Sequence, residues 1–232
     1  RAAGQGMGDT IFYLTAKTAT ALSAQEALSK IEAQRPELLT VSLTAKDKIC
    51  PFPESHCNPA ECAYAKGHYD RVRDAVFTAI EKEKRMDRQR IQEYAKQFMV
   101  CPFELELDIS TWSDVIIGDY NYAFDPTVSL KRFFQEGKSD YTLLVDEAHN
   151  LPDRAQRMFS AEVRIQDLEK LQRFFTGRPP SYQPRLRRRL GEILAWLTKR
   201  RESLRDGEMM TETAPSEEFC QLLQDLNLRL SE

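Results

Sequence analysis

The amino-acid sequence predicts an α/β fold: a parallel sheet is interrupted by a cysteine-rich, mainly helical insertion and followed by a helical region. Three observations support this prediction. Short apolar runs rich in β-prone residues alternate with helical periodicity up to residue 153, and no convincing strand run follows that residue. Between two of the apolar runs, three cysteines fall within thirteen residues of proline-rich sequence.

Four segments are predicted as strands, because each is a short run of apolar and β-prone residues. They are Thr10–Thr15, Leu38–Leu43, Val115–Ile117 and Tyr141–Val145. Helical periodicity lies between them, at residues 19–34, at residues 64–98 and, more briefly, at residues 129–135. Strands separated by helical segments favour a parallel α/β sheet.

Composition excludes several classes of protein. The chain has 232 residues, of which 41% are hydrophobic and 30% charged, so it is not fibrous, low-complexity or wholly disordered. No apolar run approaches the ~20 residues of a membrane span, and we expect no membrane partner. The 33 basic and 36 acidic residues nearly balance, so any basic surface must be local. Because the chain starts with Arg1 and ends within a helical pattern, we expect a piece of a longer protein.

Four of the five cysteines are candidate metal ligands. The odd count, and the lack of a secretory signal, argue against a disulfide framework. The four candidates are Cys50, Cys57, Cys62 and Cys101. Neighbouring prolines favour turned or extended backbone, in which four thiolates can converge on zinc or an iron–sulfur cluster, although the Cys-x-x-Cys pairs usual for structural zinc are missing. The alternative is four ordinary buried cysteines; Cys220 lies in a helical apolar stripe and is expected in the core.

A pair of carboxylates follows the last predicted strand. Asp146 and Glu147 stand at its C-terminal end, where open α/β sheets bind ligands. Asp146 can hold Mg²⁺ through water, and Glu147 can orient and deprotonate an attacking water. His149, two residues on, can hydrogen-bond to a second lobe. The alternative is a strand that ends in polar residues at a surface turn; the full Asp-Glu-Ala-His string is more specific than the acidic pair.

This string introduces a resemblance to a known family. Residues 145–150 match the DEAH-type motif II of superfamily 2 helicases, and the chain resembles the iron–sulfur helicases of the XPD/DinG family, especially their bacterial members. Residues 12–18 resemble motif Ia, and the four cysteines lie between it and motif II. Residues 101–105 resemble the segment at the last cluster cysteine, and residues 114–126 resemble the strand and loop that follow. The resemblance covers residues 8–155; the helical region beyond fits the family's arch domain by position only.

The resemblance implies a partial RecA-like motor lobe with an iron–sulfur insertion and an arch-like C-terminal region. It divides the chain into four parts. Residues 1–45 would be the first part of motor lobe 1, residues 46–102 the cluster insertion, residues 103–157 the second part of the lobe, and residues 158–232 an arch fragment.

The implied activity is ATP-dependent unwinding of duplex DNA by 5′-to-3′ translocation on single-stranded DNA. The cofactors would be ATP with Mg²⁺, served by Asp146, Glu147 and His149, and a [4Fe–4S] cluster. Its four ligands would be Cys50, Cys57, Cys62 and Cys101. The expected partners are single-stranded and forked duplex DNA. We expect a monomer in the bacterial cytoplasm, associated with the nucleoid and with DNA repair.

Two groups of residues are candidate DNA contacts. By resemblance, Thr15, Lys17 and Thr18 would touch the DNA backbone, since hydroxyls and an ammonium suit phosphate oxygens. The alternative is a solvated turn in which Thr18 caps a helix. Residues 178–205 hold nine basic and two acidic residues, a local net charge of +7. There Arg187 and Arg188 are the candidate DNA residues, and a solvated helix face is the alternative.

The chain departs from the family at the phosphate-binding loop. The Gly-Lys-Ser triplet at residues 137–139 does not provide it, because Arg132 occupies the required upstream glycine position and the triplet precedes a strand. As given, the chain is expected to hydrolyse essentially no ATP, the loop lying upstream in a longer protein. The alternative function is a non-catalytic nucleic-acid-binding module that is stapled by an iron–sulfur cluster or zinc.

Overall fold

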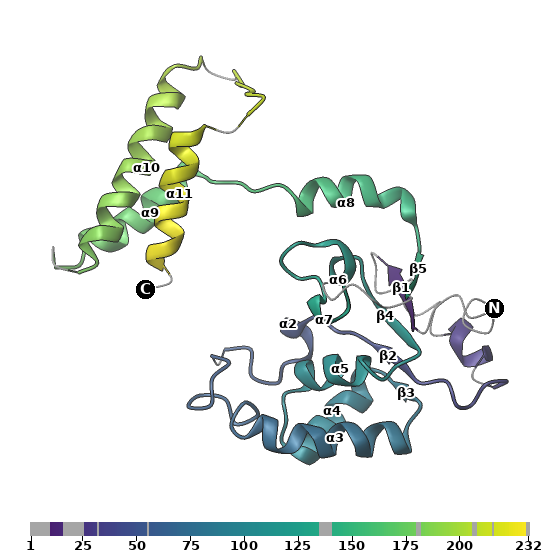
Figure 1. Cartoon of the computed structure of the whole chain (residues 1–232). Helices are drawn as coiled ribbons and strands as arrows, with labels where there is room; N and C mark the ends of the chain where they lie inside the picture. The colour runs from purple at the N-terminus through teal and green to yellow at the C-terminus, as the bar shows by residue number, and fades with distance from the viewer. Residues whose placement is uncertain are drawn as a thin grey trace. The chain divides into compact units, whose positions relative to one another are not determined.

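The chain forms two compact units, residues 1–160 and residues 161–232, in a computed structural model (Figure 1). The structure describes residues 10–15, 26–31, 33–54, 56–134, 141–179, 182–205, 208–214 and 216–230. Of the helix predicted at residues 19–34, the described residues 26–31 are helical, and most of the remainder lies outside the described residues.

The first unit is built on a five-stranded sheet with the order β3-β2-β4-β1-β5. The strands are β1 (Thr10–Thr15), β2 (Thr40–Ser42), β3 (Arg85–Met86), β4 (Val115–Asp119) and β5 (Tyr141–Val145). Every neighbouring pair is parallel, which confirms the predicted α/β class. The four predicted strands are all present, and β3 is an addition.

Residues 64–98 are mostly helical, as predicted, but a short strand interrupts the helical structure near its centre. The structure has α3 (His68–Lys82), then β3, then α4 (Arg88–Phe98). Asp87 begins α4, since its carboxylate accepts a hydrogen bond from the backbone N–H of Arg90 at 2.9 Å. Met86, between the helices, is fully buried and pairs with Val41 of β2. The break therefore depends on a tertiary partner that helical periodicity does not reveal.

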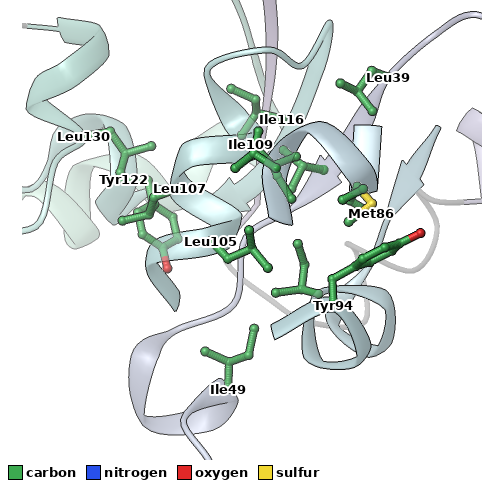
Figure 2. Close-up of a cluster of buried hydrophobic side chains, with 14 of the residues drawn as sticks. Leu39, Ile49, Met86, Tyr94, Leu105, Leu107, Ile109, Ile116, Tyr122 and Leu130 are labelled. Atoms are coloured by element: carbon green, nitrogen blue, oxygen red, sulfur yellow. The ribbon is translucent and has the colours of Figure 1, made fainter. Parts of the chain in front are cut away.

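Central and edge strands differ in burial. In β4, which lies between β2 and β1, the first four residues are buried, as expected for a central parallel strand. In β5, which pairs only with β1 among the described residues, Leu143 is 40% and Leu144 47% exposed. The core cluster draws side chains from β3, α4, α5 and β4, including Met86, Tyr94 and Leu105 (Figure 2).

Helices surround this sheet. Besides α3 and α4, the first unit contains α2 (Lys46–Ile49), α5 (Pro102–Ser110), α6 (Asn121–Phe124), α7 (Lys131–Phe134), the short 3₁₀ helix η2 (Ala148–Asn150) and α8 (Leu151–Met158). The helices α3, α4 and α5 pack against one another, and α5 also contacts β2 (Figure 1). Proline begins α5 at its first position, where the missing N–H costs nothing.

The described part of the second unit is helical, as predicted. It contains α9 (Ile165–Thr176), α10 (Pro184–Glu202) and α11 (Glu217–Leu230). Their core is formed by Phe175, Leu186, Leu190 and Leu194, with Leu226 packed against it. An ion pair between Arg189 and Asp225 also joins α10 to α11. Within the described residues of the whole chain, no helix is long and apolar enough to cross a membrane.

Candidate functional site

Three strands end together at one edge of the sheet. Their register places Thr15 of β1 opposite Asp119 of β4, and Leu14 of β1 opposite Val145 of β5. Asp146 and Glu147 therefore emerge next to Thr15 and at the same edge as Asp119, which lies on the other side of β1, although these positions lie far apart in the sequence. Ligands of open parallel sheets bind outside this carboxyl edge.

Asp146 is held in place by its neighbours in the sheet. Its backbone N–H donates to the carbonyl of Leu14 at 2.9 Å, and the hydroxyl of Tyr120 donates to its carbonyl oxygen. Its carboxylate accepts a hydrogen bond from Tyr13. Burial, followed by this bond and by the negative charge of Asp146, raises the pKa of the Tyr13 hydroxyl, which therefore stays a donor.

Glu147 turns the chain sharply after β5. Its φ of 51° lies in the left-handed region, which is unfavourable for a residue with a Cβ atom. Two groups of Asn150 secure the turn, since its backbone N–H and its side-chain amide donate to the Glu147 carbonyl at 2.9 and 3.2 Å. The Glu147 carboxylate lies 3.2 Å from Nδ1 of His149, and the two side chains are 55% and 73% exposed. Of the predicted site residues, Glu147 and His149 are thus brought together and are open to solvent, whereas the carboxylate of Asp146 is bonded to Tyr13.

The structure shows a second ion pair at this edge, between two residues that the sequence analysis did not predict as site residues. Nη2 of Arg154, on α8, donates to both carboxylate oxygens of Asp119 at 2.7 and 2.9 Å. The same guanidinium donates to the side-chain oxygen of Asn121 at 3.2 and 3.3 Å. The segment after the Asp-Glu pair is therefore tied back to the end of β4. The available sequence signal was an aspartate, Asp119, two residues after the apolar run of a predicted strand.

The candidate DNA contacts after β1 are described only in part. Thr15 is 5% exposed, so its side chain is almost fully buried in the sheet edge. Lys17 and Thr18 lie outside the described residues.

Two of the four candidate ligand cysteines stand at the ends of helices. Cys50 follows the last residue of α2, and Cys101 precedes the first residue of α5. All four are free thiols, of which Cys57 is exposed and the others are half-buried. A hydrogen bond to Cys57, and the nearby Cys101, raise the pKa of the Lys46 ammonium.

Cys101 has the most enclosed of these environments. Burial raises the pKa of its thiol, although backbone N–H groups of Glu104 and Phe103 point at the sulfur and the charge of Cys50 is felt there. The backbone N–H of Cys101 donates to Nδ1 of His68 at 3.2 Å. Burial also lowers the pKa of His68, which keeps this imidazole a neutral acceptor.

Four cysteine sulfurs are suitable ligands for zinc or for an iron–sulfur cluster. Their positions in the structure, however, do not form a metal site. Among the described residues, no three His, Cys, Asp or Glu side chains lie close enough together to hold one ion. Converging thiolates repel one another until a cation binds, so metal binding commonly assembles such a site.

The two candidate arginines of the second unit are engaged differently. Arg187 donates to the backbone carbonyls of Pro179 and Arg178 at 3.1 and 3.5 Å. Arg188 is 83% exposed and forms an ion pair with Glu192 at 2.9 Å. Arg187 therefore binds the residues that follow α9, whereas the Arg188 side chain is largely exposed to solvent.

Comparisons with known proteins agree with this architecture. The DEAD_2 family model matches residues 21–168. The regulator of telomere elongation helicase 1 homolog of Caenorhabditis briggsae is 29% identical over 101 residues, which cover 41% of this chain and 10% of that protein. The chain thus spans about a tenth of the length of this curated relative.

Two solved structures share the fold. One, titled Truncated XPD, has a TM-score of 0.56 and 18% identity over 97% of this chain and 65% of its own. The other, titled XPD_Helicase, has a TM-score of 0.56 and 19% identity over 97% of this chain and 39% of its own. At this identity the likeness shows the fold alone, that of a partial RecA-like lobe with attached helices. Because the family model covers more than half of the sequence, the chain belongs to the DEAD_2 family.

Proposed function

We propose that this chain is part of an ATP-dependent DNA helicase that unwinds duplex DNA by moving 5′ to 3′ on a single strand. The observation that carries the proposal is the position of Asp146 and Glu147 at the carboxyl edge of a parallel sheet. Membership of the DEAD_2 family, and the helicase named as its relative, support the same activity.

The geometry supports a role for each of the three residues. Asp146, fixed by Leu14 and Tyr13, would hold the water shell of Mg²⁺, which neutralises charge on the phosphates when it is bound. Glu147 projects from a tight turn into solvent, where its carboxylate can orient and deprotonate the attacking water. His149, beside it, would hold the Glu147 carboxylate by a hydrogen bond until nucleotide binds.

The edge of the sheet supports a role within a longer protein. Leu143 and Leu144 of β5 are exposed by 40% and 47%, and exposed apolar edge strands invite pairing with further structure. We propose that a motor segment carrying the phosphate loop covers this edge. We retain residues 1–45 and 103–157 as the two parts of motor lobe 1. Residues 46–102 would then be the insertion, and residues 158–232 the arch fragment.

We also propose that the insertion binds a [4Fe–4S] cluster through the four cysteines. Support comes from the donor set and from the electrostatic proximity of Cys50 to Cys101 and of Lys46 to Cys57. When bound, the cluster would cross-link a turn-rich segment, residues 50–67, that buries few side chains of its own. The proposed partners are single-stranded and forked DNA, contacted by Thr15, Lys17, Thr18, Arg187 and Arg188.

The motor activity is tested on the longer protein that contains this chain. Glu147→Gln should abolish DNA-stimulated ATP hydrolysis and leave binding of single-stranded DNA intact, because the substitution removes only the base. A wild-type protein that binds DNA and hydrolyses no ATP would instead establish the non-catalytic binding module. Retained hydrolysis in the variant would remove Glu147 from the proposed role.

A further inference from the structure

The end of α9 and the start of α10 form a strongly basic region. Residues 170–191 contain seven basic side chains and no Asp or Glu. The seven are Lys170, Arg173, Arg178, Arg185, Arg187, Arg188 and Arg189. Charge density of this kind attracts polyanions, provided that the charges are not neutralised within the fold.

Only some of these charges are neutralised by carboxylates. Lys170 pairs with Asp167 at 2.8 Å, Arg188 pairs with Glu192, and Arg189 pairs with both Glu192 and Asp225. Within the described residues, the remaining four have no carboxylate partner; they are Arg173, Arg178, Arg185 and Arg187. Four guanidinium groups thus remain to meet an external anion.

Two exposed aromatic rings lie beside one of these four guanidinium groups, that of Arg178. Phe174 is 49% and Tyr182 43% exposed, and the guanidinium of Arg178 lies 5.1 and 5.8 Å from their ring centroids. Phe175, which is 5% exposed, contacts both rings, with centroids 5.5 Å from Phe174 and 6.1 Å from Tyr182. The exposed rings are therefore anchored to the core of the unit and still present surface to solvent.

A surface hollow of about 350 Å³ lies next to the buried ring of Phe175. It is lined by Gln172, Arg173, Phe175, Thr176, Arg187 and Leu190. Arg187 is held there by its hydrogen bonds to the carbonyls of Pro179 and Arg178, so that its charge is positioned in advance. Two guanidinium groups above an apolar floor suit a phosphate with part of its sugar.

We propose that this α9–α10 corner, defined as Arg173, Phe174, Arg178, Tyr182, Arg185 and Arg187, binds single-stranded DNA. Bases would stack on Phe174 and Tyr182, and phosphates would contact Arg173, Arg185 and Arg187. The inference rests on the proposed function, to which it adds a base-stacking platform in the second unit. Exposed ring faces distinguish a single strand from a duplex, whose bases already stack on one another. The exposed rings also favour a single strand over an acidic polypeptide, which would bind through the basic side chains alone.

The test uses the 232-residue chain and two fluorescent 20-nucleotide probes of equal charge, oligo(dT) and a fully abasic strand. The wild type should bind oligo(dT) about tenfold more tightly than the abasic strand, because stacking contributes only to the first. Tyr182→Ala and Phe174→Ala should each remove most of that preference and leave abasic binding unchanged. Phe159→Ala, which removes a ring that is 72% exposed outside the corner, is the matched control and should bind both probes as the wild type does.

A salt titration tests the charged part of the corner. Arg173→Ala and Arg185→Ala should weaken the binding of both probes alike. Each should also lower the salt slope by about 0.7 for every phosphate that the removed guanidinium had neutralised.

The outcomes separate the corner from the broader proposal. If the wild type binds oligo(dT) and both ring variants keep its preference, the α9–α10 corner is not the base-stacking site, and the proposed DNA binding stands. If the wild type binds neither probe, the proposed DNA binding fails with it. Equal competition by poly-glutamate of matched charge would replace the single strand with an acidic protein partner.

Discussion

Arg154 donates from a single nitrogen to both carboxylate oxygens of Asp119, at 2.7 and 2.9 Å, and so ties α8 to the end of β4. The two side chains are only 30% and 37% exposed, so solvent weakens the pair less than it weakens a fully exposed one. Because α8 follows soon after the turn at Asp146 and Glu147, this pair ties the segment after that turn to the carboxyl edge of the sheet.

Removal of this pair should destabilise the first unit. Arg154→Ala leaves Asp119 without its main partner and should cost about 1–2 kcal/mol of unfolding free energy, measured by urea denaturation. The matched control is Arg35→Ala, which breaks an ion pair with Glu37 whose side chains are 64% and 63% exposed. The control should leave the urea midpoint unchanged. Equal midpoints for wild type and Arg154→Ala would show that the pair contributes nothing.

Glu106 should make the stability of the protein depend on pH. It is fully buried on α5; one carboxylate oxygen accepts from the backbone N–H of Thr44 at 2.9 Å, and the other has no partner among the described residues. Burial raises the pKa of Glu106 from 4.5 to about 9. Between these values the folded state keeps a proton that the unfolded state releases, so the unfolding free energy falls as pH rises.

The variant Glu106→Gln stays neutral at every pH. Its urea midpoint should therefore change less between pH 5.5 and pH 8.5 than the midpoint of the wild type does. Over this range, the titration of Glu106 lowers the unfolding free energy of the wild type by at most about 1.4 kcal/mol per pH unit. The gap between the two proteins should narrow towards pH 5.5. Parallel decline of both midpoints would show that Glu106 does not hold its proton.

The left-handed backbone conformation of Glu147 should lower the stability of the protein at the residue that we propose as the base. Glycine adopts φ = 51° without a Cβ clash, so Glu147→Gly should raise the unfolding free energy by about 0.5–1 kcal/mol while it removes the proposed base. Glu147→Val should lower it by about 1–2 kcal/mol, because a β-branched residue is least tolerated there. Thermal unfolding of the three proteins checks this order. A glycine variant less stable than the wild type would refute it.

Metal loading should order the cysteine segment. Reconstitution of the chain with iron and sulfide under anaerobic conditions should give broad absorbance near ~400 nm and about four irons per chain. Trypsin cleavage at Lys66 should then slow, because the cluster restrains residues 50–67.

Serine variants identify the ligands. Cys50→Ser, Cys57→Ser, Cys62→Ser and Cys101→Ser should each lower the iron content, whereas Cys220→Ser, on α11, should retain it. Colourless protein that binds one zinc ion would replace the cluster with a zinc site.

The sequence by itself determined the fold class and the position of the acidic pair. Apolar runs such as Phe12–Leu14 and Val115–Ile117 were long and β-prone enough to predict buried strands. Alternation with helices then implied parallel pairing, and parallel pairing implied that Asp146 and Glu147 would stand at a carboxyl edge. These inferences needed only local pattern and chain connectivity.

Only the tertiary structure shows which strands and side chains contact one another. Helical periodicity extends through residues 64–98, yet Met86 lies in a strand that pairs with β2. That pairing is possible only once the sheet has formed. Asp119 and Arg154 are 35 residues apart, and Phe174, Arg178 and Tyr182 meet at a corner between two helices. Local sequence specifies which face of an element is apolar, whereas the identity of the group that meets each side chain depends on how the elements pack.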